Sequence, residues 1–371
     1  MAKVHAENLR RLSNVEIVAI AGSNDARARE FGTSIGVERT TGNFQELLTD
    51  LSIDSVHVLT PNALHYPICR AALEAQKHVL CEKPFTVSLE QARELVDLAA
   101  RTGLANCIQH NLRYYPLVQQ VRRMIEAGDL GEILIVQGTY SQDWLLYETD
   151  WNWRVNAAAN GALRVMGDIG SHWMDTIQHV TGLRITELCA DLSTFHRTRR
   201  RPPASTETFA KTFSGAKAQS DQFVNVPVDT EDFGSVLLHL GDRARGAFTV
   251  SQMSAGRKNM FTFDIYGAKA GVSWNQERPN ELWIGQRNKP NEMLIKDPSL
   301  LYPEAAAYAD LPGGHSEGYE DTHKQVFKRF YARVADPSAP VDYPTFQDGF
   351  LGMTLLDKIA ESAKRRAWVR I

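Results

Sequence analysis

Cysteine is scarce in this chain, and long apolar runs are missing altogether. The four cysteines (Cys69, Cys81, Cys107 and Cys189) lie far apart and form no C-x-x-C pair, so neither a disulfide framework nor a cysteine zinc site is expected. No apolar stretch is long enough to span a bilayer, and the polar start, Met1 to Arg11, lacks the apolar core of a signal peptide. These absences predict a cytoplasmic protein with reduced thiols.

Neither basic nor acidic residues are in strong excess, with 41 lysines and arginines against 44 aspartates and glutamates. The formal net charge is −3 over 371 residues, so we expect no nucleic-acid partner and no membrane partner. Hydrophobic residues make up 43% and charged residues 23%, which is typical of a globular protein. Because the length exceeds what one hydrophobic core usually serves, two domains are predicted.

The first third of the chain alternates apolar strands with helices. We predict strands at Val15–Ala21, Ser55–Leu59, His78–Cys81 and Leu104–Ile108, with helices at Asp25–Phe31, Asn43–Thr49, Ala63–Ala75 and Leu89–Ala100. Strands that are apolar throughout and separated by helices indicate an α/β fold with a doubly wound parallel sheet. Ligands bind beyond the carboxyl ends of such strands, which selects Gly22–Asn24, Thr60–Asn62, Glu82–Pro84 and Gln109–Asn111.

After Arg113 the pattern changes. A helix at Leu117–Ala127, a long strand at Glu132–Gln142 and a helix at Asp168–Val180 precede strand patterns at Ile185–Phe195, Ser235–Leu240, Gly246–Gln252, Met260–Tyr266 and Gly271–Trp274; helices near Glu320–Arg333 and Thr345–Arg365 close the chain. This order predicts an α+β domain with an open, mainly antiparallel sheet whose bare face suits a subunit interface. We place the domains at 1–112 and 113–371, and we expect a surface loop over Arg197–Thr230.

Two short segments carry candidate chemistry. Lys83 closes a strand, where burial would make it an acid–base or hydrogen-bonding group; a surface turn at Pro84 is the alternative. Asp168 and His172 lie four residues apart on one helix face, so Asp168 is a candidate to bind a substrate hydroxyl and His172 to exchange its proton. A helix cap and a core histidine are the alternative. Asp175 and His179 continue the stripe, but without a third ligand cluster we expect no metal.

Aromatic residues crowd the segment after the long strand: Trp144, Tyr147, Trp151 and Trp153. Flat rings pack against the C–H faces of sugars, and neighbours such as Arg154 can bind hydroxyls. A contact between domains or subunits is the alternative. The basic run Arg197–Arg201 is interpreted as a solvated loop.

Three motifs, in this order and separation, resemble the Gfo/Idh/MocA family: TPNALHYPICRAALEAQKHVLCEKPF (Thr60–Phe85), AGDLGEI (Ala127–Ile133) and GDIGSHWMD (Gly167–Asp175). The resemblance implies a Rossmann domain that binds NAD or NADP, followed by an α/β substrate domain that forms homodimers or homotetramers. It implies an oxidoreductase that transfers a hydride to or from a hydroxyl-bearing carbon of a sugar, a sugar derivative or a cyclitol.

The resemblance, the strand-end rule and the aromatic segment together give the expected site. The catalytic residues that the resemblance implies are Lys83, Asp168 and His172. The cofactor-binding residues are Gly22, Ser23, Asn24, Thr60, Pro61, Asn62, His65, Glu82, Lys83 and Gln109. The substrate-binding residues are Tyr140, Trp144, Trp153, Arg154, Asp168 and His172.

The start of the chain departs from the family pattern. Family members open with a strand and a G-x-G-x-x-G turn, whereas MAKVHAENLRRL resembles the helix that follows that turn. We therefore expect a first domain without its central strand, from a late start or in a non-functional fragment. In the family pattern, a carboxylate near the end of the second strand, here Val15–Ala21, contacts the ribose of NAD. Asp25 lies slightly after that position, while Arg27 and Arg29 are candidates to bind the 2′-phosphate of NADP. Both NAD and NADP are therefore expected as possible cofactors. NAD-dependent glycoside cleavage and non-catalytic sugar binding are the alternative functions.

Overall fold

The computed structural model describes residues 1–202 and 223–371 of the chain. They form two compact units: residues 1–114 with 318–351 make the first unit, and residues 115–317 with 352–371 make the second. Within the described ranges, no helix combines the length and the apolar character needed to cross a membrane.

The first unit contains a three-stranded parallel sheet in the order β3–β4–β5. Its strands are β3 (Ser55–Val58), β4 (His78–Cys81) and β5 (Asn106–Ile108), and its crossovers contain η1 (Asn62–Leu64), α4 (His65–Glu74) and α5 (Leu89–Thr102). In the central strand β4, the last three residues are fully buried, as expected for a strand covered on both faces. α5 begins where the Ser88 hydroxyl accepts a hydrogen bond from the Gln91 N–H, and it ends at Gly103 in the left-handed conformation.

The strand predicted over Val15–Ala21 is confined to β1 (Ile20–Ala21). β1 pairs in parallel with β2 (Thr40–Thr41), which the sequence did not predict; α2 (Asp25–Ile35) connects the two strands and α3 (Gln45–Leu48) follows. Because a strand extends only as far as its ladder, β1 is limited by its two-residue partner in the described chain. The predicted parallel α/β architecture is therefore present as two separate sheets, β1–β2 and β3–β4–β5.

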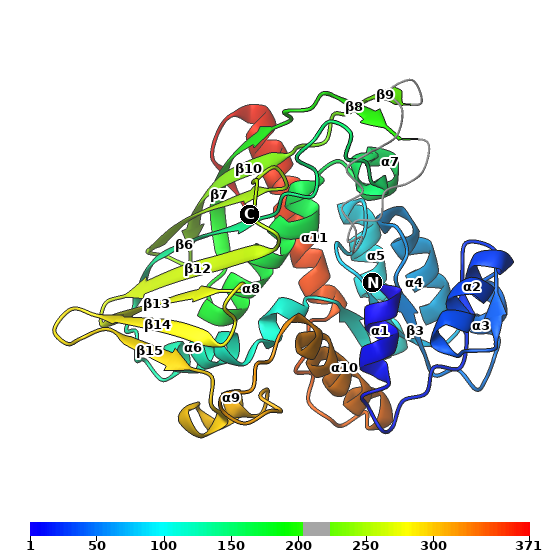
Figure 1. Ribbon diagram of the computed structural model, residues 1–371, viewed down its shortest axis with the longest axis horizontal. Helices are drawn as coiled ribbons and strands as arrows, with labels where there is room; N and C mark the ends of the chain where they lie inside the picture. The colour runs from blue at the N-terminus through cyan, green and yellow to red at the C-terminus, as the bar shows by residue number, and fades with distance from the viewer. Residues whose placement is uncertain (203–222) are drawn as a thin grey trace. The chain divides into compact units, whose positions relative to one another are not determined.

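Helices from the C-terminal part of the chain complete the first unit. α10 (Tyr319–Ala335) lies beside α1 (Ala2–Leu9) and next to η2 (Asn111–Tyr114) (Figure 1). α11 (Phe346–Arg365) begins in the first unit and ends in the second. The sequence assigned all of 113–371 to the second domain. The return of 318–351 to the first unit has a physical reason, because a parallel sheet needs helical cover on both faces.

The second unit is built on a nine-stranded sheet with the order β15–β14–β13–β12–β6–β11–β10–β7–β16. The strands are β6 (Ile133–Ser141), β7 (Ile185–Ser193), β10 (Phe233–Leu240), β11 (Ala244–Ser251), β12 (Met260–Gly267), β13 (Ala270–Asn275), β14 (Glu281–Gln286), β15 (Glu292–Ile295) and β16 (Val369–Arg370). Only the β11–β6 pair is parallel within this sheet, which confirms the prediction of a mainly antiparallel sheet. β14, β15 and β16 were not predicted, because such short runs show too little alternation.

Helices cover one face of this sheet. α6 (Pro116–Glu126) packs against β13, α8 (Ser171–Thr181) against β6 and η4 (Met166–Gly170) against β11. α9 (Pro303–Ala306) lies against α6, and the unit also contains the short helices η3 (Trp153–Val155), α7 (Ala157–Asn160) and η6 (Pro298–Leu300). Trp173 of α8 stacks on Phe248 of β11 with ring centres 4.4 Å apart, and its indole N–H donates to the Thr262 carbonyl at 3.1 Å. These contacts place the core of the second unit between α8 and the sheet.

The opposite face of the sheet is open. Leu237 of β10 aligns with Ala247 of β11, and Ala247 aligns with Gln137 of β6. Ile135 lies two residues from Gln137 and so points to the same face. Ile135 and Leu237 are 48% and 49% exposed, which leaves apolar surface on a face that no helix of the described residues covers.

The polar stretch predicted as a surface loop over Arg197–Thr230 begins and ends in structure. β8 (Thr198–Arg201) pairs antiparallel with β9 (Val224–Pro227), and residues 203–222 lie outside the described residues. Within β8, Arg199 is fully buried, so the interpretation of Arg197–Arg201 as a solvated run is wrong at this position. The cause is a buried carboxylate, Asp232, to which Arg199 donates at 2.8 Å.

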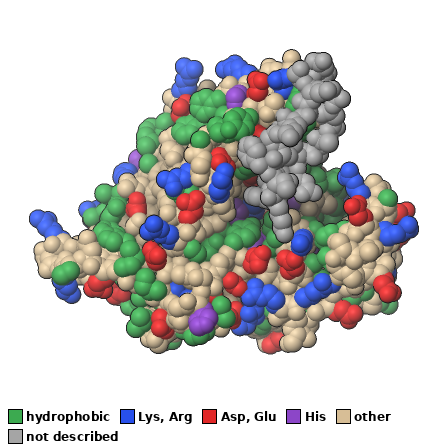
Figure 2. Space-filling view, in the orientation of Figure 1, with side chains coloured by type: hydrophobic (Ala, Val, Ile, Leu, Met, Phe, Trp, Pro, Cys, Tyr) green, Lys and Arg blue, Asp and Glu red, His purple; other side chains and the backbone are tan. Residues whose placement is uncertain are grey.

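Charged side chains are spread over the surface. On the face shown in Figure 2, lysine and arginine side chains lie among aspartate and glutamate side chains, with hydrophobic groups between them. This mixing matches the small formal net charge of −3. A field of one sign, which would steer a polyanion, is therefore not built into that face.

Candidate active site

Two buried polar atoms at the carboxyl ends of parallel strands have no hydrogen-bond partner within the described residues. They are Thr60 Oγ1, just beyond β3, and Gln109 Oε1, directly beyond β5. The other end of the Gln109 amide is fixed, since its Nε2 lies 2.6 Å from His323 Nδ1. A buried polar atom costs free energy unless a partner reaches it, so both atoms suit a bound polar ligand at the edge where such sheets bind ligands.

His65 braces the loops that follow β3 and β4. Its ring is fully buried, with Nε2 at 2.9 Å from the Thr60 carbonyl and Nδ1 at 2.9 Å from the Pro84 carbonyl. Burial lowers the pKa of His65, and the hydrogen bonds to the Pro84 and Thr60 carbonyls partly offset that effect. Both ring nitrogens therefore face the strand-end loops themselves. Pro61 precedes η1, and Asn62 within it is buried.

Glu82 and Lys83 do not form the surface turn that was the alternative interpretation. Glu82 is 7% exposed and Lys83 is half-buried. The Lys83 backbone N–H donates to Glu82 Oε2 at 3.3 Å, while Glu82 Oε1 lies 3.0 Å from His5 Nε2. Burial alone would raise the pKa of Glu82, but the hydrogen bond and charge of His5, together with the charge of Lys83, lower it to about 2. The Glu82 carboxylate is thus held between His5 and the backbone N–H of Lys83.

The residues after β1 form a tight helix start. The Gly22 N–H donates to the Thr41 carbonyl at 2.9 Å, and a Cβ at Gly22 would lie 2.8 Å from the Ala28 nitrogen. Only glycine therefore fits this close approach of strand and helix. Asn24 caps α2 by accepting from the Arg27 N–H at 2.9 Å, and Ser23 is exposed beside it. Ser23 and Asn24 are both exposed, and the Asn24 side chain serves the helix.

Asp168 is held between two donors in the second unit. It lies in the π turn η4, is 9% exposed, and accepts at Oδ2 from Gln252 Nε2 at 2.8 Å. Its Oδ1 lies 3.4 Å from Arg154 Nε. Because a carboxylate can only accept, two facing donors stabilise its ionised form. Asp168 is therefore fixed as an acceptor, and the alternative of a simple helix cap does not describe it.

His172 follows in the first turn of α8 and is 6% exposed. Its ring lies beside Tyr140 of β6, with ring centres 6.3 Å apart. The Tyr140 hydroxyl donates to Asn259 Oδ1 at 2.8 Å, which fixes that ring. The structure thus brings together three residues that the sequence predicted, Asp168, His172 and Tyr140, on one side of the second unit.

The tryptophans of the segment after β6 make two kinds of contact. Trp144 and Trp151 pack against a buried cluster that contains Val155, and the Trp144 indole N–H donates to Gln142 at 2.8 Å. Trp153 is different, because the Arg154 guanidinium lies over its ring at 4.6 Å. Since Arg154 also faces Asp168, these contacts connect Trp153 and Arg154 to Asp168.

A buried ionic cluster next to the site was missed by sequence reasoning. Arg164, Arg199 and Asp232 are fully buried; both arginines donate to Asp232, and Arg164 also donates to Gln252 Oε1 at 3.0 Å. Burial would raise the pKa of Asp232, but the charges of Arg164 and Arg199 lower it. Arg199 further donates to the carbonyls of Leu145, Tyr147 and Asp150. The cluster therefore ties the aromatic segment to the Gln252–Asp168 pair.

Sequence and structure comparisons place the chain among known oxidoreductases. A profile described as "Oxidoreductase family, NAD-binding Rossmann fold" matches residues 1–110, and one described as "GFO/IDH/MocA C-terminal domain" matches residues 118–273. The chain belongs to the Gfo/Idh/MocA family. As a member of this family it has a Rossmann-like NAD-binding domain and is an NAD(P)-dependent oxidoreductase that acts on CH–OH groups.

Three Gfo/Idh/MocA relatives illustrate the range. Levoglucosan dehydrogenase from Pseudarthrobacter phenanthrenivorans is 28% identical over 95% of this chain and 88% of that protein. The NADP(+)-dependent D-xylose 1-dehydrogenase from Hypocrea jecorina is 36% identical over 44% of this chain and 45% of that protein. An inositol dehydrogenase homologue from Azotobacter vinelandii, solved with NADH and myo-inositol, has a TM-score of 0.85 and 26% identity, covering 100% of this chain and 93% of that one.

The strand-end residues of this Gfo/Idh/MocA chain fit the nicotinamide group of a dinucleotide. A carboxamide carries both donors and an acceptor, which are the partners that the buried Thr60 Oγ1 and Gln109 Oε1 lack among the described residues. Gly22 at the start of α2 allows close backbone packing, as dinucleotide folds require. On these observations the residues present fit the cofactor of the family.

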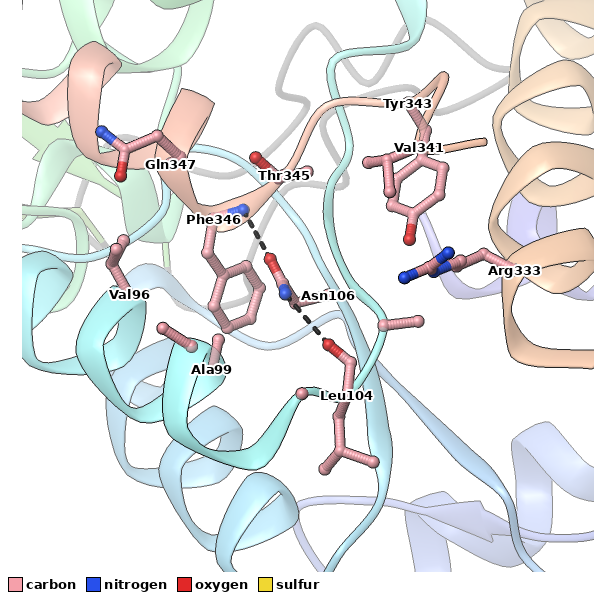
Figure 3. Close-up of a pocket in the computed structure, with 13 residues that line it drawn as sticks. Val96, Ala99, Leu104, Asn106, Arg333, Val341, Tyr343, Thr345, Phe346 and Gln347 are labelled. Carbon is pink, nitrogen blue, oxygen red and sulfur yellow. Dashed lines mark hydrogen bonds between the residues drawn. The ribbon is translucent and has the colours of Figure 1, made fainter. Parts of the chain in front are cut away.

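Among the described residues, neither a group of metal-binding side chains nor the cavity of the first unit involves these positions. The described residues contain no group of three His, Cys, Asp or Glu side chains placed to hold a metal ion, and His179 Nε2 lies near the donors Gln119 and Arg122. A cavity of about 360 Å³ in the first unit is lined by residues such as Leu104, Arg333 and Tyr343. Figure 3 shows the Arg333 guanidinium and the Tyr343 hydroxyl pointing toward each other there. No predicted site residue lines this cavity.

Proposed function

We propose that this protein oxidises or reduces a ring hydroxyl of a sugar, a sugar derivative or a cyclitol, with Lys83, Asp168 and His172 as its catalytic residues. The observation that carries the proposal is the Asp168–His172 arrangement: a buried carboxylate fixed between Gln252 and Arg154, with a buried imidazole four residues later. Such a pair binds a hydroxyl and exchanges its proton, which is the acid–base half of a dehydrogenase reaction.

The three residues have distinct roles in this proposal. Asp168 accepts a hydrogen bond from a substrate hydroxyl and so orients it. His172 takes the proton of the reacting hydroxyl at one ring nitrogen during oxidation and returns it during reduction. Lys83 donates to the reacting oxygen and stabilises its developing negative charge. A bound nicotinamide supplies the two-electron redox chemistry.

The cofactor contacts are proposed at the strand ends of the first unit. Thr60, Pro61, Asn62, His65, Glu82, Lys83 and Gln109 form the nicotinamide side, and Gly22, Ser23 and Asn24 lie toward the ribose. The unpartnered Thr60 and Gln109 atoms support the first group. Support for the second is the exposed Ser23 at the start of α2. No acidic side chain occupies positions 22–24, so both NAD and NADP are included.

A small polyol is the substrate class that the second unit favours. Tyr140, Trp144, Trp153 and Arg154 are the proposed substrate contacts beyond Asp168 and His172. The Arg154 guanidinium lies over Trp153 and near Asp168, which gives one apolar ring face and two hydroxyl partners close together. The relatives named after levoglucosan, D-xylose and inositol have substrates of this chemistry.

Self-association is part of the proposal. The open face of the nine-stranded sheet exposes Ile135 and Leu237, and apolar patches of this kind are typical of interfaces. A homodimer or homotetramer formed through this face is the expected state, and analytical ultracentrifugation of an Ile135→Lys/Leu237→Lys variant tests it. A cytoplasmic location is likewise proposed, supported by four cysteines that form no disulfide.

The function is tested by incubating the purified protein with NAD⁺ or NADP⁺ and a panel of anhydrosugars, aldoses and cyclitols, while reduced cofactor is followed by its absorbance. Reduced cofactor formed with one member of the panel, and absent without it, is the expected result. Release of an aglycone from a glycoside without net cofactor reduction would instead identify a glycoside-cleaving enzyme. Sugar binding in calorimetry with no turnover would overturn the enzymatic proposal.

A further inference from the structure

A continuous chain of hydrogen bonds crosses the first unit from Ser55 to Glu82. Ser55 Oγ lies 3.0 Å from the Tyr331 hydroxyl, which lies 3.1 Å from His57 Nε2. His57 Nδ1 lies 2.9 Å from His5 Nδ1, and His5 Nε2 lies 3.0 Å from Glu82 Oε1. The chain thus links β3, α10, α1 and the end of β4. Apart from Glu82, these residues have no part in the reaction described above.

The chemistry of each group fixes the direction of the chain. A carboxylate only accepts, so His5 donates to Glu82 through Nε2. A neutral His5 then accepts at Nδ1, which requires His57 to donate at Nδ1 and accept at Nε2. Tyr331 therefore donates to His57 and accepts from Ser55. In this arrangement every donor points toward Glu82.

One additional proton reverses the far part of the chain. When His5 carries protons on both nitrogens, it donates to Glu82 and also to His57. His57 then donates to Tyr331, and Tyr331 donates to Ser55. Every contact is satisfied in both arrangements, which differ by a single proton that enters at Ser55 and reaches His5 by successive hops. No heavy atom has to move between them.

The near end of the hydrogen-bond chain meets the backbone of Lys83, a catalytic residue in the proposed function. Glu82 Oε1 faces His5, and Glu82 Oε2 accepts from the Lys83 backbone N–H at 3.3 Å. We propose that His5, His57 and Tyr331 are positioning residues for Lys83, which fix the Glu82 carboxylate beneath the lysine backbone and set the charge beside it through one exchangeable proton. This inference rests on the role of Lys83 in the proposed function.

The surroundings confine that proton to the His5–Glu82 end. Burial, together with the charge of His5, lowers the pKa of His57, and burial raises the pKa of Tyr331 to about 12. Both groups are therefore neutral at physiological pH in their resting state. Phe327 packs on both imidazoles, with ring centres 4.8 Å from His5 and 5.1 Å from His57.

Other titratable groups face the chain. Ring centres of His323 and His5 lie 5.8 Å apart, and burial lowers the pKa of His323 to about 3, so this third histidine is neutral. Asp54 raises the pKa of Tyr331, and the amino group of Met1 acts on His323. Lys83 itself acts on Glu82. None of these groups interrupts the four contacts of the chain.

The first test needs no enzymatic activity. In protein labelled with ¹⁵N-histidine, Tyr331→Phe removes one hydroxyl and keeps the ring that stacks on His57 at 5.9 Å. We expect the ¹⁵N signals of both His57 and His5 to shift, because loss of the Tyr331 hydroxyl changes the preferred tautomer of both rings. His78→Gln is the matched control, since His78 lies at the opposite end of β4 and accepts from the Ala105 N–H at 2.9 Å. A shift of the His57 signals without any shift of the His5 signals would show that the hydrogen bonds from Tyr331 to Glu82 are not coupled.

The second test separates positioning from folding. His5→Leu removes the donor to Glu82, and we expect kcat to fall at least about tenfold, with the KM of the sugar within about twofold, as for loss of a hydrogen bond to a charged group. His5→Gln restores a donor and most of kcat but cannot carry charge. Because glutamine cannot take up a second proton, the pH profile of kcat for His5→Gln should differ from that of the parent.

The outcomes are distinguishable. A folded His5→Leu protein with the kcat and pH profile of the parent would overturn the inference, and if His5→Leu does not fold, Tyr331→Phe and His5→Gln give the same readouts. Coupled histidine signals in a protein with no turnover on any polyol would contradict the proposed function but support the hydrogen-bond chain. Normal turnover with uncoupled histidine signals would contradict the hydrogen-bond chain alone.

Discussion

The side-chain amide of Gln252 donates to Asp168 Oδ2 at 2.8 Å. Its other end accepts from Arg164 Nη1 at 3.0 Å, and because a guanidinium can only donate, the amide cannot turn over. Gln252 is completely buried. Arg164 therefore fixes the amide that donates to the Asp168 carboxylate.

Gln252→Leu is expected to lower kcat/KM roughly tenfold to a hundredfold, because a hydrogen bond to a charged group contributes about 1.5–3 kcal/mol. Steady-state kinetics with the best polyol measures the effect. Gln276→Leu, at another buried glutamine of the same unit, is the control and should stay within about threefold of the parent. Equal losses in the two variants would indicate general damage to packing.

His172→Ala is expected to reduce turnover by about two to four orders of magnitude, the usual contribution of general acid–base catalysis. The variant should still bind cofactor, as followed by fluorescence of the reduced form. His179→Gln, near the other end of α8, provides the comparison and should retain most of the activity. Turnover of His172→Ala near that of the parent would remove His172 from the mechanism.

Arg199 and Arg200 are neighbours in β8 with opposite expected effects. Arg199→Ala removes the donor to the Leu145 and Asp150 carbonyls and one of the two arginines that pair with the buried Asp232, so the free energy of unfolding should fall by about 3–5 kcal/mol. The Arg200 side chain is 36% exposed and lies 3.6 Å from Glu148, so Arg200→Ala should change stability by less than about 1 kcal/mol. Urea unfolding of both variants measures the difference, and similar values would refute the structural role given to Arg199.

Asp348 makes the stability of the first unit sensitive to acid. Burial alone would raise its pKa, but the charge and hydrogen bond of Arg113, at 2.8 Å, lower it from 3.8 to about 2. A lowered folded-state pKa gives stability that is fully present above the unfolded value and is lost as the pH falls through the folded value. Asp348→Asn should therefore cost about 2 kcal/mol at pH 7.

The same variant gives a pH signature. The stability difference between the parent and Asp348→Asn should shrink between about pH 4 and about pH 2 in urea unfolding experiments. Asp357→Asn, at an exposed position of the same helix, should show no such trend. A difference that stays constant with pH would show that the ionised Asp348 does not supply this stability.

The sequence predicted most elements because their apolar periodicity is strong. β4 has the predicted bounds, and Lys83, Asp168 and His172 lie at an element end or in a first helical turn, where local motifs indicate chemistry. Gln252 was not predicted, because its partner Asp168 lies 84 residues away and periodicity reports burial without naming partners. Nothing in the local sequence distinguishes Gln252 from any other strand-end glutamine.

Arg199 and His5 were missed for related reasons. An arginine in a run of basic residues is rarely fully buried, so the sequence favours solvent, and only Asp232 in the folded chain reverses that expectation. His5 belongs to a helix whose partners come from β3, β4 and α10. Buried polar networks of this kind depend on tertiary contacts, which a single sequence does not reveal.

The most direct test of the account compares Lys83→Met, His172→Ala and the double variant in one assay of cofactor reduction. Residues that act as a unit on one substrate show losses that are far from additive. The account predicts that Lys83→Met alone lowers kcat by at least about a hundredfold and that the double variant is little slower than the slower single variant. Near-normal turnover of Lys83→Met, or losses that simply multiply in the double variant, would contradict it.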